Sequence, residues 1–165
     1  NLLKLRDISV GEIMTPRVVM TTVGENDNVG EIMKRIPIMV HGRMPVVGDS
    51  VDELQGLVLR SEILRRAASD EFTLLMSEIC REILSCDIRT SVDRALDMLL
   101  ETKEQLLVVK DQFGGTAGLV TMEDIIETLL GVEIVDESDQ AGIDDGRLHE
   151  DMRELAKLRF DSETE

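Results

Sequence analysis

The stretch "TAGLVTMEDIIETL", residues 116–129, decides the fold because a related stretch stands earlier in the chain. That stretch is "LQGLVLRSEILRRA", residues 54–67, at an offset of 62 residues. In each, a glycine and a short apolar run lead into the pattern of an amphipathic helix. The apolar face of the second helix is expected to consist of Ile125, Ile126, Leu129 and Leu130. Gly131 is expected to end this helix. Repetition of this kind predicts two copies of one structural unit.

The repeat extends toward the N-terminus. Three further pairs of stretches align: "RMPVVGD" (43–49) with "QLLVVKD" (105–111), "NVGEIMKR" (28–35) with "SVDRALDML" (91–99), and "VGEIMTP" (10–16) with "MSEICRE" (76–82). The first of these pairs has the same offset of 62, and the others need small gaps. Each copy is predicted to be strand, helix, strand, strand, helix, which is a mixed α/β (α+β) fold.

A unit of roughly 60 residues buries little core by itself, so the two copies are expected to pack face to face about a pseudo-twofold axis. The first copy is expected at residues 10–70 and the second at 74–134. Residues 1–9 would form a linker to a preceding part of the protein. Residues 135–165 would form an acidic segment and a short amphipathic helix, which is expected over 147–160.

Charge and composition exclude several classes of function. The net charge of the 165 residues is −16, and residues 123–165 carry −11 of it. Such a surface repels phosphate backbones, so a nucleic-acid partner is not expected. The acidic residues are either a solvated tail or a surface that attracts divalent cations. No apolar run is long enough to span a membrane. Cys80 and Cys86 are expected to be buried, reduced thiols.

Thr121 and Asp124 stand where the last strand of the second copy gives way to its helix. One interpretation is a capping box, in which the two side chains bond free N–H groups of the first turn. The other is a ligand site, because a helix N-terminus attracts phosphate and a carboxylate can bind ribose hydroxyls. The first copy has Leu59 and Glu62 at these places and so lacks the hydroxyl. No catalytic triad or phosphate-binding loop can be assembled, so no catalytic residue is expected.

The tandem arrangement resembles paired CBS domains, known as the Bateman module. The "GLVTMED" stretch (118–124) matches the adenosine-nucleotide motif of that superfamily, which is glycine, two apolar residues, Thr or Ser, two variable residues and Asp. "VGEIMTPR" (10–17), "DQFGGTAGLVTMEDIIETLLG" (111–131) and "EIVDESD" (133–139) are similar to the cytosolic part of the CorC/CNNM family, some members of which are called hemolysin-like. The resemblance implies a cytosolic regulatory module of a plasma (inner) membrane protein that moves magnesium or cobalt, with a preceding transmembrane domain. It also implies a homodimer, and the absence of a catalytic set predicts no enzymatic activity.

The resemblance implies one complete nucleotide cleft, lined by the start of the first copy and the closing motif of the second. Its expected residues are Thr15, Val19, Met20, His41, Gly42, Met44, Gln105, Leu119, Thr121 and Asp124. Thr121 would contact the phosphates and Asp124 the ribose of ATP, ADP or AMP. Mg²⁺ would be needed for tight ATP binding by so acidic a protein. No protein metal ligands are expected.

A second cleft is expected to be empty or weak, because Leu59 offers phosphate no donor. Its residues would be Arg81, Leu84, Cys86, Leu59 and Glu62. Two alternative functions stay open. The pair could be an assembly module with both clefts empty, or a nucleotide hydrolase whose acidic tail holds Mg²⁺. The segment from Glu133 to Asp139, expected to be extended, could serve as a dimer contact or a cation site.

Overall fold

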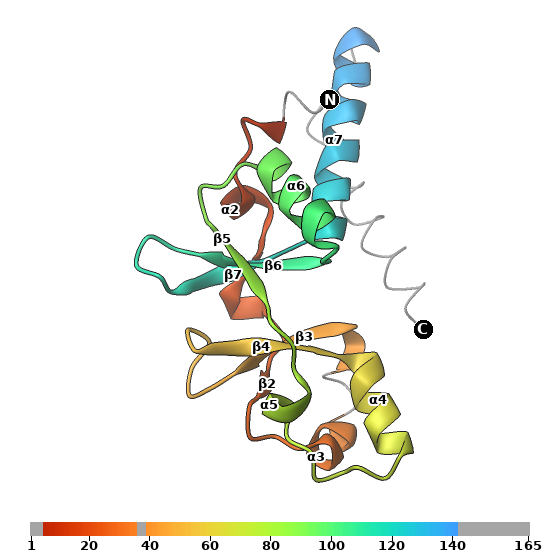
Figure 1. Ribbon diagram of the computed structural model, residues 1–165. Helices are drawn as coiled ribbons and strands as arrows, with labels where there is room; N and C mark the ends of the chain where they lie inside the picture. Colours follow the sequence, from red (N-terminus) through yellow and green to blue (C-terminus); the bar gives the residue numbers. More distant parts are fainter. Residues whose placement is uncertain (1–4, 36–38, 142–165) are drawn as a thin grey trace.

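The structure is a computed structural model, which describes residues 5–35 and 39–141 of the chain (Figure 1). The first repeat consists of α2 (Val10–Ile13), β1 (Thr15–Pro16), η1 (Arg17–Val19), β2 (Val23–Gly24), α3 (Val29–Lys34), β3 (Arg43–Val47), β4 (Leu54–Leu59) and α4 (Arg60–Ala68). The second consists of α5 (Met76–Ile79), β5 (Leu84–Asp87), α6 (Val92–Thr102), β6 (Leu106–Lys110), β7 (Thr116–Thr121) and α7 (Met122–Ala141). The helix expected over 147–160 lies outside the described residues and stays a prediction.

The predicted order of elements is confirmed in both repeats. Each contains strand, helix, strand, strand and helix, from β2 to α4 and from β5 to α7, with a short helix in front. Local signals explain the helix starts. Asn28 caps α3 by accepting the N–H of Glu31 at 2.8 Å, and the Glu31 carboxylate accepts the N–H of Asn28 at 2.9 Å. This capping box satisfies two N–H groups that have no partner inside the helix.

The strands form two sheets, in the orders β2-β3-β4 and β1-β7-β6-β5. Strand β1 belongs to the first repeat but pairs antiparallel with β7 of the second, with Thr15 opposite Leu119. The exchange is reciprocal, because Arg81 of the second repeat forms an antiparallel bridge with Leu57 of β4. The first segment of each repeat therefore pairs with a strand in the sheet of the other repeat. A reciprocal exchange of this kind is what an approximate twofold relation between the repeats produces.

The helices cover the outer faces of the two sheets, and the inner faces meet (Figure 1). Alternation along each strand sends successive side chains to opposite faces. The outward-facing residues form one apolar core per repeat. The inner faces contribute a third cluster of buried residues, which consists of Leu57, Leu106, Val108 and Leu119. Met20 packs against this inter-repeat cluster. The aliphatic composition thus yields three small cores.

The single offset of 62 expected from the sequence is wrong for β3. Arg43 pairs with Leu59, whereas Leu106 pairs with Thr121, so Arg43 is the counterpart of Leu106. The strand offset is therefore 63 before the turn and 62 after it. The reason is that the turn between β3 and β4 is one residue longer than the turn between β6 and β7. This shift moves Met44 to the face that is covered by helices.

The predicted end of the last helix at Gly131 is also wrong. Helix α7 continues through Gly131 to Ala141, so the acidic segment that was expected to be extended is helical from Glu133 to Ala141. A glycine inside a helix costs only about 1 kcal/mol. Leu129 and Val132 on either side of it pack against the core of the second repeat and offset that cost. Among the described residues, no helix is both long and apolar enough to cross a membrane.

The expectation for the two thiols is half right. Cys86 is buried in the core of the second repeat. Burial raises the pKa of its thiol to about 11. Cys80 is only half-buried and packs at the margin of the first core. Cys80 directly follows α5, which reaches over to the sheet of the first repeat, and this position leaves one side of it open.

Candidate functional site

Thr121 is the last residue of β7, and α7 begins at the next residue. The N–H of Thr121 donates to Asp124 Oδ2 at 3.0 Å, and the N–H of Asp124 donates to Thr121 Oγ1 at 3.2 Å. The two side chains therefore form a capping box, as one of the two sequence interpretations predicts. The box leaves capacity for a ligand, because each carboxylate oxygen can accept more than one hydrogen bond.

The start of the first repeat lies beside this junction. Thr15 and Leu119 are direct partners in the antiparallel pair of β1 and β7, so their side chains share a face. Thr121 lies two residues after Leu119 and shares that face as well. It is the inner face, since Leu119 belongs to the inter-repeat cluster. The tertiary structure thus brings the Thr15 hydroxyl and the Thr121–Asp124 pair to one end of β7.

Glycine is required at position 118 by the exchanged strand. A Cβ on Gly118 would collide with the Thr15 carbonyl oxygen and lie 3.0 Å from Met14 Sδ. Gly56 has the same role in the first repeat, where a Cβ would lie 2.5 Å from the Arg81 carbonyl oxygen. The glycine that opens each repeated stretch therefore makes room for the backbone that arrives from the other repeat.

Gln105 and Met20 complete the surroundings of the Thr121 junction. The Gln105 carbonyl accepts the N–H of Met122 at 2.9 Å, which fixes the start of β6 against the first turn of α7. Met20 follows η1 and packs against the inter-repeat cluster, of which Leu119 is a member. Val19 is 62% exposed and points to solvent. Five of the predicted residues around Thr121 are therefore gathered by the fold, and Val19 lies at their margin.

His41, Gly42 and Met44 lie at the other junction, at the start of α4. The Gly42 carbonyl accepts the N–H of Arg60 at 2.9 Å, as Gln105 does for Met122. His41 is exposed. The side chain of Met44 is fully buried in the core of the first repeat, so it cannot line an open wall as the sequence suggested. Figure 1 shows that α4 and α7 start on the same side of the two sheets, so the two junctions lie on one side of the molecule.

The family model of the CBS domain matches residues 10–69 and 76–131. The chain belongs to the CBS domain family. A CBS-domain structure of the bacterial CNNM/CorC family Mg²⁺ transporter in complex with ATP superposes with a TM-score of 0.74 at 30% identity, over 79% of this chain and 92% of that one. A CBS-domain pair with bound AMP from Klebsiella pneumoniae superposes with a TM-score of 0.67 at 30% identity, over 74% and 98% of the two chains.

Among curated relatives of this CBS pair, the magnesium and cobalt efflux protein CorC of Vibrio cholerae is 30% identical over 158 residues. The match covers 96% of this chain and 52% of that protein. The chain thus spans about half the length of the curated relatives it matches. The predicted fold and family are confirmed by these similarities.

In the first CBS repeat, an ion-pair network occupies the corresponding junction at the start of α4. The Glu62 carboxylate accepts hydrogen bonds from Arg65 at 2.7 and 3.0 Å and from Arg66 at 2.8 Å. These bonds, that of Arg65 foremost, lower the pKa of Glu62 to about 2. Leu59 precedes the helix without a side-chain cap. The Glu62 carboxylate is therefore held by two arginines, and the Thr121 hydroxyl has no counterpart at Leu59.

The sequence assigned Leu84 and Cys86 to the second cleft, and the structure places both elsewhere. Cys86 is buried in the core of the second CBS repeat, and Leu84 packs against the same core. Both alternate with Ser85, which pairs with Val108 of the inner face. Arg81 pairs with Glu104 at 3.2 Å. Within the described residues, no group of three or more His, Cys, Asp or Glu side chains could hold a metal ion.

Sequence reasoning missed two features of the CBS pair. The first is the space that Gly118 and Gly56 make for the exchanged strands, for which the repeated glycine was an available signal. The second is a polar contact between the repeats made by Arg17, Asp52 and Thr116. No short stretch of sequence predicts this contact, because its members lie far apart in the sequence.

Proposed function

We propose that this CBS pair is a regulatory module that binds an adenine nucleotide, ATP, ADP or AMP, at the Thr121 junction. The observation that carries the proposal is the polar pair of Thr121 and Asp124 at the start of α7, with Thr15 of the exchanged strand on the same face. The similarity to CBS pairs that hold ATP or AMP at 30% identity supports it. The nucleotide would bridge the two repeats.

Each group of the nucleotide has a suitable partner at this junction. The first turn of α7 carries a partial positive charge that attracts phosphate. The Thr121 and Thr15 hydroxyls would add donors to the phosphates. The Asp124 carboxylate would accept hydrogen bonds from the ribose hydroxyls. Met20 and Leu119 offer an apolar surface to the adenine ring. A ligand held in this way favours the arrangement in which both repeats are within reach.

Mg²⁺ enters this proposal as a partner of the nucleotide. ATP brings several negative charges to a protein of net charge −16. A Mg²⁺ ion bound to the phosphates through water and phosphate oxygens would reduce that repulsion without protein ligands. We therefore expect Mg²⁺ to strengthen ATP binding far more than AMP binding. This difference would let the module respond to the magnesium concentration.

Isothermal titration calorimetry with ATP, ADP and AMP, each with and without Mg²⁺, tests the proposal. Asp124→Ala should raise the Kd at least tenfold, because about 1.4 kcal/mol of ribose contact suffices for that change. The matched control is Glu123→Ala, which removes the same charge from the same helix turn at an exposed position. Absence of binding up to millimolar nucleotide would refute the proposal, as would equal effects of the two variants.

The module is proposed to sense the nucleotide rather than to cleave it. The hydrogen bonds of Thr121 and Asp124 are capping interactions, and such groups would hold a ligand without attacking it. Incubation with ATP and Mg²⁺ should therefore release no phosphate above the buffer rate. Release that disappears in Asp124→Ala would favour the hydrolase alternative.

A second candidate function is assembly through α4 and α7. Leu64, Ile126 and Leu130 are 43%, 40% and 53% exposed on these two helices, which lie on one side of the molecule (Figure 1). Exposed apolar side chains can mark an interface, and these three lie on the same side of the molecule. We propose a homodimer that covers them. Analytical ultracentrifugation should show a dimer for the wild type and a monomer for Leu130→Asp, while a monomeric wild type would refute it.

The transport context is a proposal for a longer protein. The efflux activity in the name of the Vibrio cholerae relative belongs to a protein about twice the length of this chain. We propose that the CBS pair is the cytosolic regulatory part of a membrane protein that moves magnesium or cobalt. Magnesium efflux from cells that express the complete gene product should respond to Asp124→Ala and stay unchanged in Glu123→Ala.

A further inference from the structure

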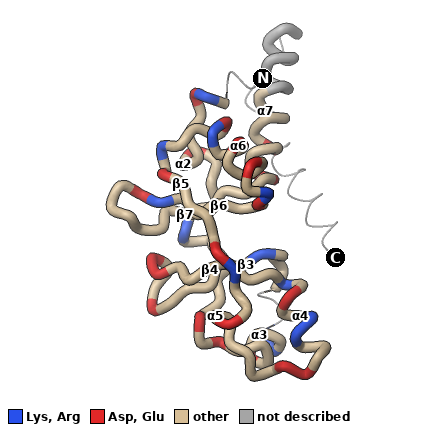
Figure 2. The backbone as a smooth tube through the Cα atoms, viewed as in Figure 1, with Lys and Arg blue, Asp and Glu red and all other residues tan. Residues whose placement is uncertain are grey.

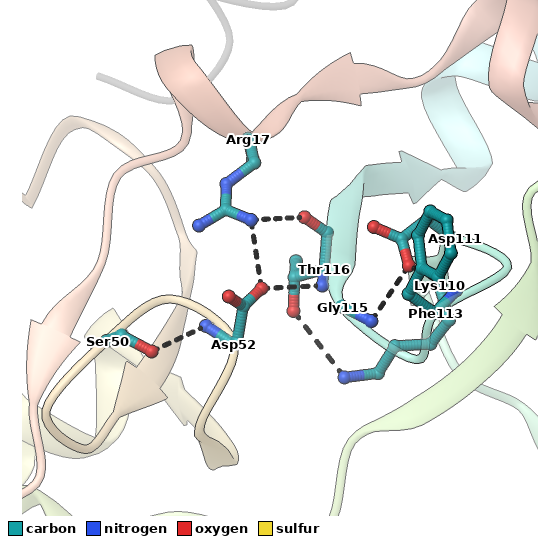
Figure 3. Close-up of polar contacts among 8 residues, drawn as sticks. All are labelled: Arg17, Ser50, Asp52, Lys110, Asp111, Phe113, Gly115 and Thr116. Carbon is teal, nitrogen blue, oxygen red and sulfur yellow. Dashed lines mark hydrogen bonds and ion pairs between the residues drawn. The ribbon is translucent and has the colours of Figure 1, made fainter.

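Three segments from different parts of the chain meet in one polar cluster, made of Arg17, Asp52 and Thr116 (Figure 3). Arg17 Nη1 donates to Asp52 Oδ1 at 2.9 Å and to the Thr116 carbonyl at 3.2 Å. The N–H of Thr116 donates to the same Asp52 Oδ1 at 2.9 Å. Arg17 begins η1, Asp52 lies in the turn between β3 and β4, and Thr116 begins β7. The inter-repeat polar cluster therefore ties both hairpins to the segment that carries Thr15.

Hydrogen bonds within each hairpin turn fix its conformation where the two turns contact each other. Asp52 is held from its own side, because its N–H donates to Ser50 Oγ at 3.2 Å. In the opposite turn, Asp111 Oδ1 accepts the N–H groups of Phe113 and Gly115 at 2.8 and 2.9 Å. A Cβ on Gly115 would lie 2.9 Å from Asp111 Oδ2 and 3.2 Å from Asp52 Oδ1. The glycine thus gives the Asp52 carboxylate access to the Thr116 backbone.

The contacts of the cluster favour the ionised form of Asp52. The hydrogen bond from the Thr116 N–H, and then the charge of Arg17, lower the pKa of Asp52 below its ordinary value. The side chains of Arg17 and Asp52 are 41% and 48% exposed, so their ion pair alone contributes little. Thr116 is fully buried, and its N–H would lose its partner without Asp52. The cluster therefore depends on Asp52 more than on Arg17.

The cluster lies at the opposite end of β7 from the nucleotide junction. Strand β1 runs antiparallel to β7, with Thr15 opposite Leu119 and Pro16 opposite Gly118. Thr15 consequently lies nearer than Arg17 to the start of α7, and Arg17 bonds the Thr116 carbonyl at the other end of β7. Figure 2 shows the turn between β3 and β4 as an acidic loop close to the second repeat. Arg17 is the first residue of η1, so its hydrogen bonds hold the chain between β1 and Met20.

We propose that Arg17 and Asp52 are positioning residues for the nucleotide site. In this role neither side chain would contact the nucleotide itself. They hold β1 and η1 in the one arrangement that presents Thr15 and Met20 to the nucleotide, and this role rests on the function proposed above. If the segment is released, only a fraction of the molecules is competent to bind, and the apparent Kd rises by the inverse of that fraction.

Asp52→Ala should raise the Kd for the nucleotide about three- to tenfold, which corresponds to a competent fraction of about a third to a tenth. Asp52→Asn should have a smaller effect, because its amide oxygen still accepts the Thr116 N–H but no longer attracts Arg17. The matched control is Asp49→Ala, which removes the same charge from an exposed position of the same turn. The control should leave the Kd within twofold of the wild type, a difference of about 0.4 kcal/mol.

Two measurements on the same variants test the inference. Hydrogen exchange of the ligand-free chain should become faster over residues 15–20 and at Thr116 in Asp52→Ala and stay unchanged in Asp49→Ala. Calorimetry with ATP, ADP and AMP then gives the Kd of each variant. Unchanged exchange in Asp52→Ala overturns the inference, and so does faster exchange with an unchanged Kd.

The nucleotide titrations distinguish a failure of this inference from a failure of the proposed function. A wild-type chain that binds none of the three nucleotides overturns the proposed function and, with it, this role of the cluster. A wild type that binds and an Asp124→Ala variant that does not support the proposed function. In that case an Asp52→Ala variant with wild-type affinity overturns the positioning role alone.

Discussion

Replacing Gly118 by alanine should damage both the stability of the chain and its nucleotide site. The added Cβ would collide with the Thr15 carbonyl oxygen and lie 3.1 Å from the Thr15 carbonyl carbon. A backbone carbonyl held in a strand cannot rotate away as a flexible side chain can. Strand β1 must therefore move off β7, and the pairing of Thr15 with Leu119 is lost.

The steric clash sets the size of the loss of stability in Gly118→Ala. Forcing an extra carbon into a packed site costs about 1–3 kcal/mol, and a rigid neighbour places Gly118→Ala at the upper end, about 2–3 kcal/mol. For a chain of this length, that corresponds to a fall in Tm of roughly 4–12 °C. Because Thr15 would also leave the Thr121 junction, the Kd for nucleotide should rise at least about tenfold.

Two other glycines of the same chain serve as controls. Gly56→Ala meets the Arg81 carbonyl oxygen in the same way, so it should lower the Tm by a similar amount. It acts at the other junction and should leave the Kd nearly unchanged. Gly42→Ala meets no atom within 4 Å and should keep the wild-type Tm. Thermal unfolding and calorimetry give both values. The reasoning is refuted if Gly118→Ala keeps the wild-type Tm, or if Gly56→Ala weakens binding as much as Gly118→Ala.

Two further predictions concern titration. The folded-state pKa of Glu62 is about 2, below its ordinary value of 4.5, so its contribution to stability is present above pH 4.5 and is lost as the pH falls toward 2. Urea unfolding should therefore show the advantage of wild type over Glu62→Gln shrinking from about pH 6 to about pH 2.5, and a constant advantage would contradict this. Cys80 should react with iodoacetamide well before Cys86, because the buried Cys86 thiol has a pKa of about 11. Mass spectrometry of a partly alkylated sample decides this, and equal rates would show that Cys86 is accessible.

The sequence by itself determined the features that depend on neighbouring residues. The order of strands and helices follows from apolar periodicity within each copy, and the capping box of Thr121 and Asp124 follows from a spacing of three residues. These interactions are local, so each can be inferred from a short window. Where the local signal was ambiguous, the inference failed. Gly131 could end a helix or continue one, and the packing of Val132 and Leu129 on the core decided for continuation.

Tertiary structure alone decided which repeat each segment joins and how the site is held. Thr15 pairs with a strand of the other repeat, and a one-residue difference in turn length sends Met44 into the core. Arg17 and Thr116 are 99 residues apart in sequence, and Asp52 and Thr116 are 64 apart. Contacts over such separations form only after the sheets have packed. Their partners are set by the geometry of the packed sheets, which no local pattern of side chains encodes.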